Sequence, residues 1–326
     1  MIKLCLMIWV RLKAFPAMDI DPTTAHALFN MGAKLIMLDA PANLDFGCDL
    51  NSWQIGPRFK GLKLIPPGIH FIFYSINSSS CTTFRTGFFH EFKNAELVVK
   101  RWNADTEEFV DMDDKEQLER IASSITSFNS DMMEMDRFLG AFPLVASSQQ
   151  PVDTYKKWQH MSSFISMKLI KRILPSMIIS SMRSSSRYSD DWQASKRQDL
   201  EQVASLSGTA AKKMPQNEIG EWVNFTDVDM KLSFPAGASQ SDITMYSLDK
   251  SYLLDITLAQ NFHSPIEIIG ELNLCFTLFH LGQFYDGFAQ WKTLLLLLCQ
   301  SEVAIKKYPQ VFRGLVGKFI LTKTIL

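Results

Sequence analysis

The sequence predicts an α+β protein of two domains, with a β-rich, sandwich-like amino-terminal part that includes helices and an all-helical carboxy-terminal part. Short apolar runs rich in β-branched residues and bounded by Gly, Pro, Asn and Ser occupy the first third of the chain. Helical apolar periodicity dominates the last third, and a serine-rich stretch lies between the two. With 326 residues, of which 47% are hydrophobic, each part is long enough to bury its own core.

The first 17 residues are expected to lie outside the fold. Lys3 and the apolar residues after it resemble a signal peptide, but the apolar run is short and Phe15 stands where a signal peptidase needs a small side chain. Residues 1–17 are therefore interpreted as a disordered extension or an artefact of the gene model, with Met18 as an alternative start. No run reaches the roughly 18 apolar residues of a membrane span, so no membrane partner is expected.

Residues 18–172 are expected to form the β-rich domain. Apolar and β-branched runs separated by turn-forming residues predict strands at 34–38, 69–76, 86–92 and 96–102. A helix then follows an acidic stretch, and its apolar stripe, spaced by three and four residues, consists of Leu118, Ile121, Ile125, Phe128, Met132, Met135 and Leu139. Gly140 is expected to end it. Asp153 or Thr154 is expected to cap a second helix that contains Trp158 and reaches Leu169.

Residues 173–217 are interpreted as an interdomain linker, because serines crowd around arginines and the apolar periodicity fades. Ser184, Ser185 and Ser186 are candidate phosphorylation sites there, since added phosphate charge could switch a contact.

Residues 218–326 are expected to form a helical domain that is incomplete. Ser241 or Asp242 is expected to open one helix that runs to Ile256. The run 264–267, Ser-Pro-Ile-Glu, predicts a capping box and a second helix that stops at Gly282. A third helix after Gly282 would pair with the second as an antiparallel αα-hairpin. Such hairpins also build helical-repeat scaffolds, so a protein-interaction scaffold outside splicing stays open as the alternative.

Composition and motifs argue against an enzyme, a cofactor or a metal site. The net charge of −1 gives no general attraction to nucleic acid, and none is expected to bind directly. The five cysteines are scattered and form no Cys-x-x-Cys pair, which favours reduced thiols. The phosphate-binding, dinucleotide-binding and nucleophile-elbow signatures are absent from the sequence. His70 lies within a predicted apolar strand, where a structural, hydrogen-bonded histidine is expected.

One longer stretch is more specific than these general features. The sequence FGCDLNSWQIGPRFKG at 46–61 runs on into LKLIPPGIHF at 62–71, and it resembles the amino-terminal domain of the Aar-two splicing-factor family. The likeness continues at 87–89, 101–102, 136–140 and 155–158, and it returns in the helical part at 234–235, 248–252, 270–272, 281–292 and 299–302. It covers roughly 18–302 with a weak middle and is lost after about Lys307, which predicts a carboxy-terminally truncated or divergent member.

The resemblance implies a function without catalysis. Proteins of this family are assembly chaperones of the U5 small nuclear ribonucleoprotein, the U5 snRNP, and are found in cytoplasm and nucleus. They bind its large scaffold protein, Prp-eight, at the RNase H-like and Jab1/MPN domains, and they hold off the helicase and RNA during maturation. The family fold is a β-rich domain followed by a VHS-like helical domain.

Candidate protein-binding residues follow from side-chain type, because aromatic residues and Arg anchor interfaces. They are Trp53, Arg58, Phe59, Lys60, Lys63 and Trp291. Trp53 and Phe59 have the alternative role of closing the sheet, whereas Arg58, Lys60 and Lys63 are expected to be exposed. The loss of similarity after Lys307 suggests that apolar helix faces lack their cover, which favours an obligate partner and a lower stability than that of a longer relative.

Overall fold

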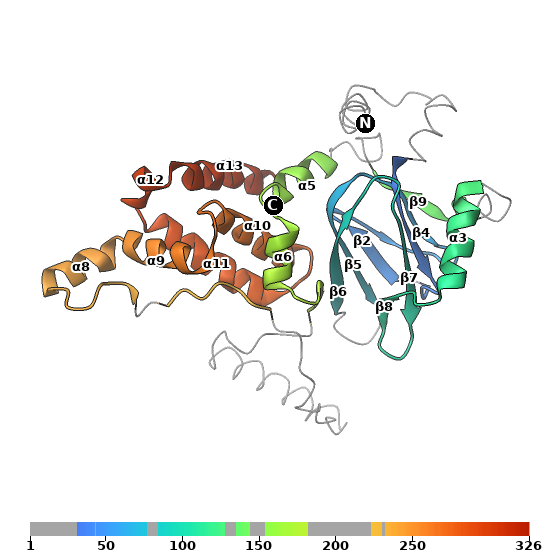
Figure 1. The fold of residues 1–326 in the computed structure, drawn as a ribbon, viewed down its shortest axis with the longest axis horizontal. Helices are drawn as coiled ribbons and strands as arrows, with labels where there is room; N and C mark the ends of the chain where they lie inside the picture. Colours follow the sequence, from blue (N-terminus) through green and yellow to red (C-terminus); the bar gives the residue numbers. More distant parts are fainter. Residues whose placement is uncertain are drawn as a thin grey trace, which may run out of the picture. The chain divides into compact units, whose positions relative to one another are not determined.

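The computed structural model describes residues 31–42, 44–76, 84–127, 135–143, 154–181, 223–229 and 232–325. Contacts divide the chain into two compact units, one of residues 1–163 together with 318–326 and the other of residues 164–317. Figure 1 shows strands β1 to β9 in the first unit, and helices α8 to α13 coloured yellow to red. The observed class is α+β, as predicted, with a β-rich amino-terminal region and a helical carboxy-terminal region.

The first sheet has the order β8-β7-β1-β4-β9. Strand β1 is central and pairs in parallel with β7 and antiparallel with β4, which pairs in parallel with β9. The strand bounds are β1 Ala33–Leu38, β4 Gly61–Ile65, β7 Leu97–Asn103, β8 Glu108–Asp111 and β9 Leu139–Ala141. Strand β1 is buried almost throughout, as its continuous apolar sequence predicts for a central strand.

In the second sheet, the strands of the first unit follow the order β6-β5-β2-β3 and pair antiparallel. These strands are β2 Leu44–Cys48, β3 Asn51–Gln54, β5 Gly68–Ile76 and β6 Arg85–Phe92. Strands β2 and β3 form a hairpin around Asp49, whose φ of 56° is left-handed. Strand β3 therefore lies at an edge of this sheet, a position where backbone and side chains are available to other molecules.

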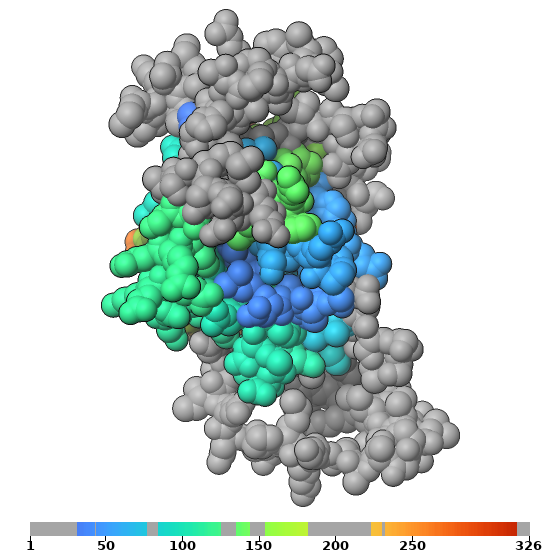
Figure 2. Space-filling view, turned by 90° about the vertical axis from the view of Figure 1, so that its right-hand side faces the viewer, coloured from blue at the N-terminus to red at the C-terminus, as the bar shows by residue number. Residues whose placement is uncertain are grey.

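The two sheets contact each other through aromatic side chains. The Tyr74 ring of β5 lies 4.9 Å from the Phe109 ring of β8, and the Tyr74 hydroxyl accepts a hydrogen bond from the Phe109 N–H at 3.0 Å. Helix α3, Lys115–Ser127, packs on the first sheet, where Leu118 and Ile121 lie against a core cluster of Ile36, Val99, Met112 and Leu139. Figure 2 shows α3 in green beside the blue strands on one face of this unit.

Gly61 is required where β4 begins. Its φ of +129° lies in a region that other residues avoid, and a Cβ there would meet the Leu35 carbonyl oxygen at 1.9 Å. The glycine thus allows β4 to lie directly against β1 and fixes the end of the loop that precedes it.

Helix α5, Thr154–Ser162, belongs to the first unit, and it contains the buried Trp158. The Trp158 indole N–H donates to the Ile69 carbonyl at 2.9 Å, and its side chain is 1% exposed. Thr154 donates from its hydroxyl to the Asn51 side-chain oxygen at 2.9 Å. The helix is therefore attached to β3 and β5 by polar bonds as well as by packing.

The second unit is helical. Its elements are α6 Met167–Ile173, β10 Ile178–Ser180, α8 Gln240–Leu248, α9 Ser251–Asn261, α10 Glu267–His280, α11 Tyr285–Cys299, α12 Ala304–Lys307 and α13 Pro309–Ile325, the last of which belongs to this unit up to Gly317. Helices α10 and α11 form the predicted αα-hairpin around Gly282. The core contains Leu253, Leu254, Ile268, Ile269, Leu294, Leu298 and Val311.

Three element boundaries differ from the sequence prediction. Leu139 is not the last residue of the long helical stripe but begins β9, because it can pair with the exposed side of β4. The helix predicted from residue 154 to Leu169 is two helices, since the Ser166 side chain accepts from the Leu169 N–H and caps α6. The helix predicted to run from Ser241 or Asp242 to Ile256 is likewise broken, into α8 and α9.

The predicted capping box before α10 is wrong. No side chain caps this helix, and the Glu267 carboxylate accepts from the His263 N–H at 3.2 Å instead. A capping box does form at α8, where Ser239 and Asp242 exchange hydrogen bonds. The boundary between the units follows Ser163, nine residues before the expected end of the first domain at 172, so α6 belongs to the helical unit. Residues 1–17 and most of the predicted linker lie outside the described residues.

Candidate protein-binding surfaces

The segment from β3 to β4 combines exposed aromatic and cationic side chains. Trp53 on β3 is 37% exposed, so it only partly serves to close the sheet. The exposed Arg58 guanidinium lies 5.1 Å from the centroid of the Phe138 ring, a cation–π contact that orients the side chain. Trp and Arg are the side chains that most often anchor protein interfaces. The arrangement therefore suits recognition of another macromolecule.

The other candidates in this segment are less accessible. The Phe59 ring is half-buried and lies 5.2 Å from the Phe46 ring. Lys60 is half-buried, and its backbone N–H donates to the Phe138 carbonyl at 3.0 Å. The Lys63 Nζ lies 2.7 Å from Asp136 Oδ1, and its side chain is 19% exposed. Expected exposure thus holds for Arg58 and is wrong for Lys63, which forms an internal ion pair.

A buried acid–histidine pair positions the hairpin that precedes this segment. Asp49 Oδ2 lies 2.6 Å from His70 Nδ1, and Asp49 Oδ1 accepts from the Phe71 N–H at 2.9 Å. His70 Nε2 lies 2.9 Å from the Pro66 carbonyl oxygen, and both side chains are 1% exposed. Burial raises the pKa of Asp49, although His70 and the Phe71 N–H oppose this shift. The predicted structural role of His70 is confirmed.

Cys48 completes a group of three potential metal ligands with Asp49 and His70. Both imidazole nitrogens of His70 already face protein oxygen atoms. Burial, and then the neighbouring Asp49, raise the pKa of the Cys48 thiol well above its ordinary value. Because the His70 nitrogens are paired within the protein, we assign the group a structural role.

The αα-hairpin of the second unit presents a row of aromatic rings. Phe279 lies 6.1 Å from Tyr285 and 4.8 Å from Phe288 between ring centroids. Phe288 is stacked on Trp291 at 6.0 Å, and Trp291 lies 6.1 Å from Phe276. Tyr285 and Phe288 are 59% and 40% exposed, whereas Trp291 is half-buried. Trp291, singled out from the sequence, is thus one member of a larger aromatic surface.

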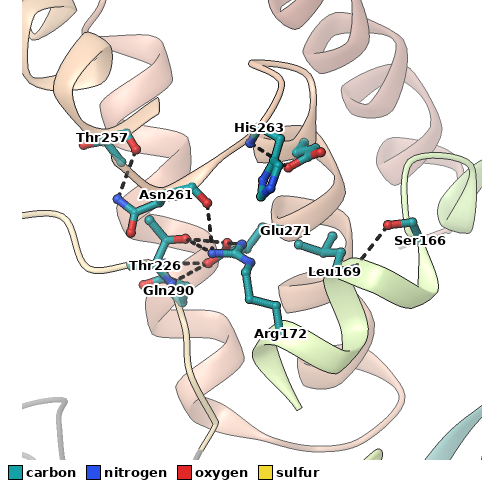
Figure 3. A network of polar contacts seen from close by, with 10 residues as sticks. Ser166, Leu169, Arg172, Thr226, Thr257, Asn261, His263, Glu271 and Gln290 are labelled. Carbon is teal, nitrogen blue, oxygen red and sulfur yellow. Dashed lines mark hydrogen bonds and ion pairs between the residues drawn. The ribbon is translucent and has the colours of Figure 1, made fainter. Parts of the chain in front are cut away.

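A buried carboxylate holds this hairpin to two other segments. Glu271 of α10 is fully buried, and its Oε1 accepts from the Thr226 N–H at 2.8 Å and from the Gln290 amide at 3.2 Å. Its Oε2 accepts from the Thr226 hydroxyl at 2.6 Å and from Arg172 Nη2 at 2.5 Å. Figure 3 shows these groups, from α6, α10, α11 and the segment at 226, converging on one point.

Each partner of Glu271 makes further bonds in the network. Gln290 of α11 donates to the Thr226 carbonyl at 2.7 Å, and Arg172 donates to the Asn261 carbonyl at the end of α9 at 3.4 Å. Next to the carboxylate, Gly270 lets the Phe164 carbonyl approach, since a Cβ there would lie 2.3 Å from that oxygen. The polar groups around the buried charge are therefore largely satisfied, which its burial requires.

Sequence reasoning missed the exposed aromatics of α11 and the network at Glu271. Apolar residues of α11 occupy more than one face of the helix, and this was the available signal for an exposed apolar surface.

The candidate phosphorylation sites Ser184, Ser185 and Ser186 lie outside the described residues. Trp53 to Lys63 belong to the first unit and Trp291 to the second, so each surface is described separately. In the described part of the chain, no helix has the length and apolar character needed to span a bilayer.

Comparison with known protein families identifies two AAR2 regions in this chain. A profile of the AAR2 N-terminal domain matches residues 31–175, and a profile of the AAR2 C-terminal repeat region matches residues 225–321. The chain is thus a two-part protein with the domain order of AAR2 proteins. The second match reaches 321, so the inference that similarity ends after about Lys307 is wrong, and the described helix α13 occupies this region.

Individual relatives agree along most of the chain. It is 33% identical over 318 residues to "Protein AAR2 homolog" of Mus musculus, which covers 92% of this chain and 78% of that protein. It is 32% identical to the protein of the same name from Homo sapiens and 28% identical to that from Caenorhabditis elegans. The chain belongs to the AAR2 family. Membership in this family supports a splicing-related role.

Proposed function

We propose that this chain is a non-catalytic assembly chaperone of the U5 snRNP that acts in pre-mRNA splicing. In this proposal it binds the large scaffold protein Prp-eight at its RNase H-like and Jab1/MPN domains and holds off the helicase and RNA during maturation. The main support is the presence of both AAR2 domains, in order, along most of the chain. It would work in cytoplasm and nucleus.

The two surfaces described above support protein binding. Exposed Trp53 and Arg58 in the first unit, and the aromatic row of Phe279, Tyr285 and Phe288 in the second, are side chains typical of interface anchors. Trp291 supports that row from within. A VHS-like form of the helical unit is part of the same proposal, and its series of helices from α8 to α13 is consistent with it.

The direct test uses purified full-length chain and purified RNase H-like and Jab1/MPN domains of Prp-eight. Stable binding to these domains, and competition with the helicase and with RNA for them, is the expected result. Absence of binding at micromolar concentrations of each protein would contradict the proposal. Capture of other proteins without Prp-eight would favour the helical-repeat scaffold outside splicing.

A charge-reversal experiment tests the first surface. Arg58→Glu with Lys60→Glu is expected to weaken binding to Prp-eight about tenfold or more, because like charges oppose association. The matched control is Lys115→Glu with Arg120→Glu, two exposed cations on α3 of the same unit. Equal affinity of the two double variants would exclude the surface. Separately, phosphomimetic changes at Ser184, Ser185 and Ser186 are expected to lower the affinity, and unchanged binding would remove these sites from the proposal.

A further inference from the structure

Helix α11 has an exposed stripe that is almost free of charge. Exposed residues recur along it at spacings of three, four, four and three, which places them on one face: Tyr285, Phe288, Lys292, Leu296 and Cys299. Tyr285 is 59% exposed, Phe288 40% and Leu296 49%. A helix that covers a protein surface normally exposes charged and polar side chains on such a face.

The opposite face of α11 is already used by the core. Its buried residues are Asp286, Gly287, Gln290, Leu294, Leu297 and Leu298. The exposed apolar stripe is therefore additional to the face that folds the unit, and the Phe279 and Trp291 rings widen it at one end. Contiguous apolar surface of this kind marks an interaction site.

Lys292 is the one cation of the stripe and stands at its centre, four residues from both Phe288 and Leu296. It is exposed and forms neither a hydrogen bond nor an ion pair with any residue that the structure describes. A lone ammonium group surrounded by aromatic and aliphatic side chains favours a partner that offers a carboxylate at the same height. Charge thus selects among apolar partners.

The shape of the stripe favours a helical partner. From Tyr285 to Cys299 the helix rises by about 21 Å, at about 1.5 Å per residue. The backbone groups of α11 are occupied within the helix, so this face offers no hydrogen bonds to an extended strand, whereas a second helix can interdigitate along its whole length. Anchors one turn apart on a helix match a stripe with this spacing.

We infer that the α11 stripe docks an amphipathic helix of a protein partner, with apolar anchors on successive turns and an Asp or Glu near its middle. The inference rests on the proposed protein-binding function and specifies its partner chemistry. Tyr285 and Phe288 contact the apolar anchors at one end, Lys292 pairs with the carboxylate, and Leu296 contacts the anchors at the other end.

Site-specific crosslinking in the full chain provides the test. A photoreactive phenylalanine derivative replaces Leu296, and a control carries it at Glu91, an exposed residue of the first unit. After irradiation in cells, peptides joined to the chain are sequenced. The expected result is a peptide joined only through position 296 that has apolar residues at helical spacing and a central carboxylate. A proline-rich peptide, a strand-like peptide, a second copy of this chain or no product above the control would each overturn the inference.

Charge reversal then tests the pairing in the partner so identified. Lys292→Glu is expected to weaken binding about tenfold, and exchange of the partner carboxylate for Lys is expected to restore it. Lys306→Glu, an exposed lysine of α12 outside the stripe, is the matched control and should change affinity less than twofold. Tyr285→Ala with Phe288→Ala should weaken binding about a hundredfold with unchanged helix content.

The inference and the proposed function can fail separately. If wild-type chain does not bind Prp-eight at all, the proposed function fails. If it binds Prp-eight while Lys292→Glu and Tyr285→Ala with Phe288→Ala bind equally well, the function stands and the helix-docking inference fails.

Discussion

Glu271→Gln is the substitution that most directly tests how the helical unit is held together. The side chain keeps its size, so the change isolates charge and hydrogen bonding. The amide oxygen can replace Oε1 and still accept from Thr226 and Gln290. The amide NH2 then occupies the position of Oε2, where the Thr226 hydroxyl can turn to accept from it. The Arg172 guanidinium cannot accept, so it loses its bond to the carboxylate and keeps only the weaker contacts to the Thr226 hydroxyl and the Asn261 carbonyl.

The size of the effect follows from these losses. Hydrogen bonds to a charged group contribute about 1.5–3 kcal/mol, and breaking a fully buried ion pair costs about 3–5 kcal/mol. The Arg172 side chain is 34% exposed and can be partly rehydrated, so the lower part of this range applies. We expect Glu271→Gln to lower the free energy of unfolding by about 2–3 kcal/mol, a large part of a typical stability of about 5–15 kcal/mol.

Urea denaturation of the full chain, followed by the circular dichroism of its helices, measures this change. Arg172→Met removes the other member of the pair, and Lys168→Met, an exposed lysine on the same helix, is the matched control with an expected change within about 0.5 kcal/mol. The double variant should lose about 1–2 kcal/mol less unfolding free energy than the sum of the losses of the two single variants. A Glu271→Gln protein as stable as wild type, or strictly additive losses, would refute the assignment.

Three further predictions concern single positions. Asp49→Asn should cost less than about 1 kcal/mol, because the amide can donate to His70 and still accept from Phe71. Because the folded pKa of Asp49 is raised, its stability contribution is present below about pH 4 and is lost as the pH rises through that folded pKa, so the difference in unfolding free energy, wild type minus variant, should fall with pH in urea titrations. Burial raises the pKa of Asp249, but hydrogen bonds to its carboxylate outweigh this effect and the pKa is lowered, so its contribution to stability is present above about pH 4 and is lost on acidification. Asp249→Asn should therefore lower the free energy of unfolding by about 1 kcal/mol at neutral pH and by less in acid. Equal losses at both pH values would argue against this prediction. Gly61→Ala should lower the free energy of unfolding by about 2 kcal/mol or more through strain and the clash in β4, and a normal melting temperature would contradict this reason.

Local sequence rules predicted the long strands well and the short ones poorly. The central strand predicted at 34–38 is observed as Ala33–Leu38, since an uninterrupted apolar run has few other solutions. Strands β2 and β3 contain Asp45, Ser52 and Gln54, which weaken the apolar pattern. Strand β2 forms because β5 offers a partner, and β3 pairs with β2. Whether these strands form depends on pairing with strands elsewhere in the chain, and a short stretch of sequence carries no information about such pairing.

The position of Leu139 illustrates the same limit. Its spacing from Met135 fits a helix, and a stripe alone cannot distinguish a helical residue from one that starts a strand. The backbone of β4 is open on one side, and parallel pairing places Leu139 opposite Gly61. Hydrogen bonds on either side of Leu139 hold this register, from the Lys60 N–H to the Phe138 carbonyl and from the Phe142 N–H to the Lys63 carbonyl. Tertiary hydrogen bonding therefore decides the assignment.

The candidate surfaces were predicted in part for a comparable reason. Side-chain type identified Trp53, Arg58 and Trp291, but exposure depends on neighbours far away in the chain. Lys63 is removed from the surface by Asp136, which is 73 residues distant, and Glu271 is paired with an arginine 99 residues away. No local sequence pattern predicts an ion pair between residues so far apart in the chain.

Each candidate surface depends on a buried acid whose partners come from distant segments. Asp49 holds the hairpin before Arg58, and Glu271 holds the helices that present Tyr285. Changes at the buried acids act on folding first and reduce binding only through the lost shape, whereas changes at the exposed side chains should leave stability intact. A variant such as Tyr285→Ala that lost binding and also unfolded early would show that the exposed row belongs to the core. Loss of binding at full stability would assign it to a partner.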